Sequence, residues 1–300
     1  MNHASLRNRK CGVPGLMIAW HDALTLFIVS ILIHYPTMVA SQIPVVALAF
    51  LATGAQCHGH VREVIVDGIA YPGYDRWKPQ DLPDTVSWPF TTEDEGPVPV
   101  EELNGPDIIC HQGATNARAS VPVVAGQAIT IHRFNEIGGF EHPGPEMHYL
   151  APCGDAGCAR VDKNELPFFK IHQVGLTKGG MADSPTWVTQ RWATTDAHKS
   201  VVAVDGGFVD TFTVVVPKDI KPGGYVLRHE LWGLHRADKG QAEAYPQCIN
   251  INLTSPGSAS PHGVPATTMY DANDEGIKIN IWRNLQNYII PGPAIYTAPG

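Results

Sequence analysis

The sequence lacks an apolar run long enough to cross a bilayer, for which a helix needs about 20 residues. One candidate stretch, residues 23–33, stops at His34-Tyr35-Pro36, and the other, residues 43–52, is equally short. We therefore predict no membrane anchor in the mature chain. The second stretch instead leads into small residues and has the form of a secretion signal.

Positive charge is also scarce. The chain carries 21 lysine and arginine residues against 29 aspartate and glutamate residues, a formal net charge of −8. Residues 1–57 contain only Arg7, Arg9, Lys10 and Asp22 as charged groups, so the remainder has 18 basic and 28 acidic residues and a net charge of −10. An acidic surface argues against nucleic acid or an anionic membrane as a partner and is compatible with a neutral substrate.

A long amphipathic helical period is missing, as are a nucleophile elbow, a phosphate-binding loop and a dinucleotide fingerprint. No pair of acidic residues stands out for glycoside hydrolysis. Short β-type runs recur instead between glycine and proline turns, which predicts an all-β sandwich. The runs are Val61–Val66, Ser120–Val124, Ala128–Arg133, Met147–Ala151, Gly207–Val216, Gly224–Trp232, Gln247–Leu253 and Gly276–Trp282.

Two long stretches, Tyr71–Pro106 and Asp162–Ser200, are expected to be irregular, and long loops inside a compact domain are usually functional. The sequence after Leu253 begins like a linker, but residues 277–282 and 288–293 return to strand and turn character. We therefore keep residues 58–300 as one domain and expect no separate carbohydrate-binding module.

Cysteine is limited to six residues, of which Cys11 and Cys57 fall in the leader. The four that remain, an even number in a secreted chain, predict two disulfides with three pairings to choose from. Cys153 and Cys158 bracket only four residues and suit a local clip, which leaves Cys110 with Cys248. A zinc site is the alternative, although only one short spacing is present.

Asn252 begins a glycosylation sequon, Asn252-Leu253-Thr254.

The apolar run that ends at Ala52 is followed by TGAQC and then HGHV. Cleavage after Cys57 fits the small-x-small rule, and so does cleavage before His60. A chain beginning with His58 carries an imidazole and an α-amine whose pKa, about 7.7–8.0, allows it to lose a proton to a metal. A histidine pair opening an ordinary strand is the alternative. Met38 begins a signal-length segment of its own, so residues 1–37 are interpreted as a candidate upstream extension of the gene model.

Three further segments contain residues that could take part in metal binding or catalysis. His142 lies in HPGP, where two prolines fix a rigid turn. His229 lies in YVLRHE, where alternation places it on one strand face with apolar neighbours. Glu243 and Tyr245 are two residues apart in an extended segment and share a face, while Cys248 points the other way. Composition alone does not show that these segments meet in space.

Taken together, the segments resemble the fungal lytic polysaccharide monooxygenases active on cellulose, auxiliary-activity family nine, formerly glycoside hydrolase family 61. The resemblance spans essentially all of residues 58–300, and the family pattern begins at His58. The matching motifs are HGHV with VDG (66–68), DIICHQGAT (107–115), HPGP (142–145), YLAPCG (149–154), VDKNELPFFKI (161–171), GGYVLRHE (223–230), YPQCINI (245–251) and NYIIPGP (287–293).

The resemblance implies an immunoglobulin/fibronectin-like antiparallel β-sandwich that holds one copper ion. The amine and Nδ1 of His58 and the imidazole of His142 would be the ligands, and three nitrogens in one plane suit Cu(II). Tyr245 would occupy the axial direction, and His229 would be the donor to a copper-bound oxygen species. The family usually has glutamine two positions before the axial tyrosine, whereas this chain has Glu243, which donates a hydrogen bond only when protonated.

The implied activity is oxidative cleavage of β-1,4-glucosidic bonds of cellulose at C1 or C4. It would use an external electron donor and oxygen or hydrogen peroxide, in a secreted, extracellular and monomeric enzyme. Tyr288 matches the family's sugar-stacking tyrosine, and Tyr74 and Trp77 are weaker candidates for which ordinary loop packing is equally expected. The other histidines are interpreted as surface or core residues: His60, His111, His132, His148, His172, His198, His235 and His262.

Two other functions stay open at this point. A secreted sandwich that binds copper or polysaccharide without catalysis would use the same two histidines, although it needs neither His229 nor Tyr245. A glycoside hydrolase would release reducing sugars without any reductant. Oxidised oligosaccharides formed from cellulose in the presence of ascorbate separate the monooxygenase from both alternatives.

Overall fold

The computed structural model describes residues 58–76, 84–92, 94–135, 140, 142–177, 202–204 and 206–298. The predicted leader (1–57), Trp77 and His198 lie outside the described residues. Within the described part, no helix has the length and apolar character needed to cross a membrane.

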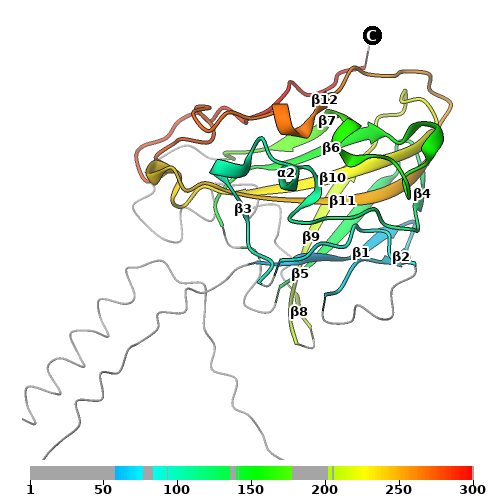
Figure 1. Cartoon of the computed structure of the whole chain (residues 1–300), viewed down its shortest axis with the longest axis horizontal. Coiled ribbons are helices and arrows are strands. Elements are labelled where there is room, and N and C mark those ends of the chain that lie inside the picture. The colour runs from blue at the N-terminus through cyan, green and yellow to red at the C-terminus, as the bar shows by residue number, and fades with distance from the viewer. Residues whose placement is uncertain are drawn as a thin grey trace, which may run out of the picture. The chain divides into compact units, whose positions relative to one another are not determined.

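Two β-sheets form the domain, as the sequence predicted (Figure 1). The smaller sheet has the order β2-β1-β5-β9-β8, and the larger has the order β12-β7-β6-β10-β11-β3. Nearly all pairings are antiparallel; the exception is β4, which pairs with β11 in parallel. The strands of the smaller sheet are β1 (His60–Val66), β2 (Ile69–Pro72), β5 (Ala128–Asn135), β8 (Val202–Val204) and β9 (Gly207–Val215). Those of the larger sheet are β3 (Val98–Pro99), β4 (Val121–Val124), β6 (Glu146–Pro152), β7 (Pro167–Val174), β10 (Gly223–Gly233), β11 (Glu243–Thr254) and β12 (Val264–Pro265).

Helical structure is limited to single turns in the described residues. They are α2 (Asp107–Cys110) and the 3₁₀ turns η2 (Val100–Glu102), η3 (Gly154–Ala156), η4 (Lys163–Glu165), η5 (Ala237–Lys239) and η6 (Ala266–Thr268). The β1–β2 hairpin turns at Asp67-Gly68, both with positive φ, 52° and 75°. An Asp-Gly pair is the residue choice that a tight two-residue hairpin requires.

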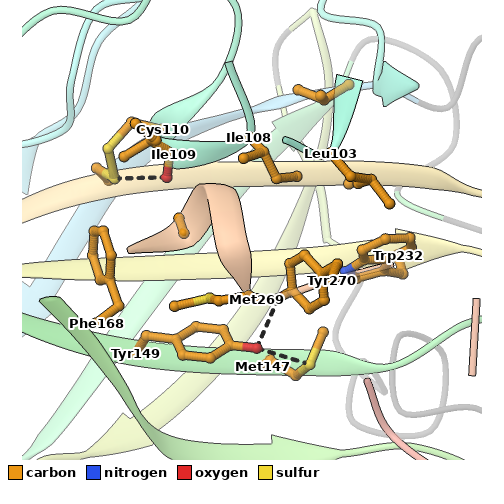
Figure 2. Packing of buried hydrophobic residues seen from close by; sticks show 14 of the residues in the cluster. Leu103, Ile108, Ile109, Cys110, Met147, Tyr149, Phe168, Trp232, Met269 and Tyr270 are labelled. Atoms are coloured by element: carbon orange, nitrogen blue, oxygen red, sulfur yellow. Dashed lines mark hydrogen bonds between the residues drawn. A yellow bond between two sulfur atoms is a disulfide. The ribbon is translucent and has the colours of Figure 1, made fainter. Parts of the chain in front are cut away.

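The larger sheet is buried on both faces. One face packs against the smaller sheet around residues such as Leu227, Leu231 and Phe212. The other face is covered by α2 and the C-terminal segment, which contribute Ile108, Tyr270 and others to a second core. Figure 2 shows this second core, where the Tyr149 and Tyr270 hydroxyls lie 2.8 Å apart. The C-terminal segment contributes Tyr270, Ile277, Ile279 and Ile281 to this core, so it packs against the larger sheet.

A fully buried ion pair, formed by Arg228 and Glu230 of β10, lies in this second core. Both terminal nitrogens of Arg228 donate to the Glu230 carboxylate at 2.7 Å, and the guanidinium also donates to the Ile108 and Ile109 carbonyls at 2.8 Å. The Tyr270 hydroxyl donates to the same carboxylate. These contacts give both charged groups hydrogen-bond partners. Removing one partner of a buried ion pair typically lowers the stability of the fold by about 3–5 kcal/mol.

Both disulfides pair as the sequence favoured. Cys110 at the end of α2 is bonded to Cys248 on β11, and Cys153 is bonded to Cys158 around η3. Asn252 is exposed on β11 and so is accessible to modification.

Seven of the eight predicted strands are present, with ends shifted by up to four residues. The prediction for Gly276–Trp282 is wrong, since residues 276–282 form turns with no ladder partner among the described residues. Its side chains nevertheless alternate: Ile277, Ile279 and Ile281 are buried and Lys278 is exposed. Strands β2, β3, β7, β8 and β12 were not predicted. β7 lies inside the stretch expected to be irregular, because burial on both faces removes the polar alternation that marks a half-exposed strand.

Candidate functional site

The ends of several strands meet at one end of the sandwich. On the larger sheet, Leu231 of β10 lies opposite both Glu146 of β6 and Tyr245 of β11. The chain segment before β1 joins this end through Gln247, whose side-chain amide donates to the Gly59 carbonyl at 2.9 Å and accepts from the Val61 amide at 2.6 Å. A single amide on β11 therefore holds the start of β1 against the larger sheet.

Three aromatic rings predicted to form the site come together here. The ring centroid of His58 lies 6.4 Å from that of His142 and 5.8 Å from that of Tyr245. The centroids of His142 and Tyr245 are 5.9 Å apart. Phe140 packs edge-on against both His142 and Tyr245, at 5.2 and 5.0 Å. Segments separated by up to 187 positions in the sequence thus place two imidazoles and a phenol around one small volume.

The HPGP turn is held rigidly against the end of β10. The Leu234 amide donates to the Pro143 carbonyl at 2.8 Å, and the Trp232 amide donates to the Pro145 carbonyl at 3.1 Å. Gly144 allows this approach, because a Cβ at that position would lie 1.9 Å from the Trp232 carbonyl oxygen. The turn and β10 therefore fix the position of His142.

We expect Gly144→Ala to displace the HPGP turn. The clash involves backbone on both sides, so relief requires movement of the chain that carries His142, at a cost of about 1–3 kcal/mol for overpacking. Gly154→Ala is the control, because its added Cβ meets nothing within 4 Å and only its positive φ, 59°, is unfavourable. Guanidinium unfolding and copper titration of both variants test this. Equal copper affinity in the two variants would contradict the role given to Gly144.

Glu243 joins the site as a neighbour of the tyrosine. The Tyr245 hydroxyl donates to Glu243 Oε2 at 2.7 Å. The same oxygen lies 3.7 Å from Nε2 of His142, and Oε1 lies 3.7 Å from Nε2 of His235. The His235 ring stacks on the His142 ring, with centroids 4.5 Å apart and planes inclined by 17°. Potential ligand atoms of His142, His235 and Glu243 all lie within 4.8 Å of one another.

Burial sets the protonation states of these groups. Desolvation, followed by the nearby His235 and His58, holds the pKa of His142 well below its usual value, so the imidazole keeps its lone pair free of a proton. Desolvation also lowers the pKa of His235 to about 4. Burial and the Glu243 carboxylate raise the pKa of Tyr245 well above its usual value, so this residue stays a neutral phenol.

The structure places His229 inside the sheet, beside His148. Its imidazole is fully buried in mid-strand β10, where Nδ1 lies 2.9 Å from Nε2 of His148 and the ring contacts Phe212 at 4.6 Å. His235 lies two residues beyond the end of β10 and faces Glu243 instead. The placement of His229 therefore differs from the prediction, and His235, which we had grouped with the structural histidines, is the residue that sequence analysis missed. The sequence feature that could have identified His235 is its position two residues after Gly233. Gly233 ends β10 and pairs with Glu243 of β11.

Two of the three predicted substrate aromatics lie in the described residues. Tyr288 is half-buried, donates its hydroxyl to the Gly276 carbonyl at 2.8 Å and lines a surface hollow of about 510 Å³ together with Arg283 and Asn287. Tyr74 is half-buried and packs on Phe90, with ring centroids 5.6 Å apart. Trp77 lies outside the described residues.

The site is partly accessible to solvent. The side chains of His58 and His142 each retain 14% exposure, Glu243 retains 20% and His235 26%. A substrate larger than the domain can therefore contact these groups without entering a deep cavity. Two imidazoles and a neutral phenol, gathered near the surface of a β-sandwich, define a metalloprotein site of the nitrogen-donor type.

Comparison with known proteins identifies the family. The sequence profile of Auxiliary Activity family 9 (formerly GH61) matches residues 58–288. An AA9 family lytic polysaccharide monooxygenase D of Podospora anserina is 38% identical over 248 residues, covering 81% of this chain and 67% of the relative. An AA9 family lytic polysaccharide monooxygenase A of Thermoascus aurantiacus is 38% identical, covering 80% of this chain and all of the relative. The solved extended catalytic domain of Hypocrea jecorina LPMO9A superposes with a TM-score of 0.69 at 38% identity, covering 79% of this chain and 90% of that one.

The chain therefore belongs to Auxiliary Activity family 9. By this membership it is a copper-dependent polysaccharide monooxygenase that acts with an external reductant.

The residues present fit a copper ion. His142 is held neutral, His58 supplies a second imidazole, and the Tyr245 phenol completes the group. Nδ1 of His58 lies 3.0 Å from the Asp94 carbonyl oxygen, a contact that a metal held at Nδ1 would replace. Two imidazoles beside a phenol suit copper better than magnesium or calcium.

Proposed function

We propose that the mature chain begins at His58, is secreted, and binds one copper ion through the His58 amine, His58 Nδ1 and the His142 imidazole. We further propose that it cleaves cellulose or a related β-1,4-glucan at C1, C4 or both, with oxygen or hydrogen peroxide as the oxidant. The convergence of His58, His142 and Tyr245 at one end of the sandwich is the observation that carries this proposal.

The bound copper would supply one-electron redox chemistry, and the protein supplies the surroundings. Phe140 and the buried Arg133, whose guanidinium carbon lies 5.6 Å from the Tyr245 ring centroid, pack behind the tyrosine and exclude water from that side. Tyr245 would in turn lie between these groups and a bound copper ion. His235 and Glu243 line the more exposed side, where they can hold or pass on a proton at His235 Nε2 or at the Glu243 carboxyl oxygens.

Three measurements test the proposal. N-terminal sequencing and metal analysis of the secreted protein should give a chain starting at His58 with one copper. Copper-loaded protein, cellulose and ascorbate should yield oxidised oligosaccharides detectable by mass spectrometry, and none should form without ascorbate. Tight copper binding without any product would instead identify a non-catalytic binder, and reducing sugars released without reductant would identify a hydrolase.

Glu243→Gln should raise the rate of oxidative cleavage by about tenfold or more, with copper binding retained. The carboxylate only accepts hydrogen bonds when ionised, whereas the amide adds donors beside the metal, and partners around metal ligands typically change activity by about 10–100-fold. Cleavage rate and copper stoichiometry should be measured on the same preparation. If copper is lost, Glu243 is itself a ligand together with His142 and His235, an arrangement that their spacing permits.

A further inference from the structure

A second cluster of metal-binding residues lies in the larger sheet. Glu146 and His148 share one face of β6, and His148 pairs across strands with His172 of β7 and with His229 of β10. A row of three imidazoles therefore crosses three neighbouring strands, with a carboxylate beside it. From the sequence alone, His148 and His172 were expected to be surface or core residues.

The spacing of these groups matches that of ligands around a small cation. Oε1 of Glu146 lies 3.6 Å from Nδ1 of His148, and the His148 and His172 ring centroids are 5.5 Å apart. A potential ligand atom from each of the three residues lies within 4.8 Å of the other two. Metal–ligand bonds of about 2.0–2.2 Å in a tetrahedron place ligand atoms roughly 3.5 Å apart and two imidazole centroids roughly 5 Å apart.

His148 points to a ligand in a second, independent way. Its side chain is fully buried, and its Nδ1 has no hydrogen-bond partner among the described residues. The Glu146 oxygen at 3.6 Å is beyond hydrogen-bond length, and an unsatisfied buried nitrogen typically costs about 1–3 kcal/mol. A metal ion between Nδ1 and the carboxylate would satisfy both groups.

The surroundings of His148 fix its orientation as they do for metal-ligating histidines. Nε2 of His148 lies 2.9 Å from Nδ1 of His229, so an N–H at Nε2 can be donated there while Nδ1 keeps its lone pair. Glu146 is buried as well, with 2% of its surface exposed. His172 is only half-buried and provides the route from solvent.

We propose that Glu146, His148 and His172 form a second metal site, separate from the copper site, that binds one divalent transition cation such as Zn²⁺. Two imidazoles and a carboxylate are a common zinc set, with water as the fourth ligand. The site bridges β6 and β7, so its occupation fastens these two strands together. His229 acts as a positioning residue that orients His148.

The test uses mature protein that has been stripped of metal, loaded with one equivalent of copper and then titrated with Zn²⁺ by calorimetry. Wild-type protein should bind one further equivalent of zinc and unfold at a higher temperature in its presence. Glu146→Gln and His172→Gln each remove a ligand with little change in volume. Each should weaken zinc binding by more than the roughly 10–100-fold typical for loss of an outer-shell partner, and each should keep its copper.

Two controls separate this site from the copper site and from surface histidines. His142→Ala should lose copper while binding zinc as the wild type does, and exposed His262→Gln should alter neither metal. Circular dichroism of the metal-free variants establishes that they are folded. The proposal is overturned if copper-loaded wild-type protein takes up no zinc, or if a folded Glu146→Gln/His172→Gln double variant binds zinc with unchanged affinity.

Discussion

Replacing His142 with alanine will remove copper binding and oxidative cleavage together. His142 is the one residue of the group that is fixed by a rigid turn, held neutral by burial and in ring contact with His58, Tyr245 and His235. Without it the proposed copper site keeps the two nitrogens of a single residue. We expect copper affinity to fall by more than about 100-fold, since loss of a mere outer-shell partner already costs up to about that factor. Oxidised products should then fall below detection.

The matched control for this prediction is His262→Ala, because His262 is exposed and lies just before β12, at the edge of the larger sheet. Copper affinity by isothermal titration and product formation by mass spectrometry should be measured on both variants. Far-ultraviolet circular dichroism verifies that each retains its sheets. Full copper affinity in folded His142→Ala would contradict the ligand assignment and would direct attention to Glu243 and His235.

The site illustrates which residues a sequence can locate and which it cannot. His58 and His142 stand in recognisable local motifs, and the resemblance to the family, not the pattern of short runs, implied that they meet. The role of His229 was implied by the resemblance at YVLRHE, and alternation along β10, which assigns a face to a residue but not its depth in the sandwich, offered no check on it. The structure places its imidazole in the interior beside His148 and Phe212. His235 follows the strand, so its approach to Glu243 depends on how the chain leaves β10, which no period in the sequence encodes.

The same distinction explains the errors in the fold. Gly276–Trp282 alternates as a strand does, since its isoleucines pack into the second core, but no strand in the described part of the chain forms a ladder with it. Alternation reports which side chains are buried, and strand pairing is a separate property. β7 shows the opposite case, since Phe168, Phe169, Lys170 and Ile171 are all buried and the strand carries no alternation at its centre. In a sheet that is buried on both faces, hydrophobic periodicity does not identify the strands.

The Cys110–Cys248 disulfide should contribute far more to stability than Cys153–Cys158. The first closes a loop with a sequence separation of 138 residues and the second one of 5 residues. In the chain-entropy description, loops of these sizes restrict the unfolded state by about 5 and about 2 kcal/mol respectively. Replacing both members of each pair with alanine should therefore lower the free energy of unfolding by about 3 kcal/mol more for the long loop than for the short one.

Location adds to this difference. Cys110 ends α2, whose Ile108 and Ile109 carbonyls accept the buried Arg228 guanidinium, and Cys248 lies three residues from Tyr245 on β11. If α2 loosens, the Arg228 guanidinium loses these two carbonyl acceptors. Cys153 and Cys158, by contrast, only close the turn around η3. Guanidinium unfolding of the two double-alanine variants at one pH measures both losses. Equal losses would show that residual structure in the unfolded chain, and not loop closure, governs what each disulfide contributes.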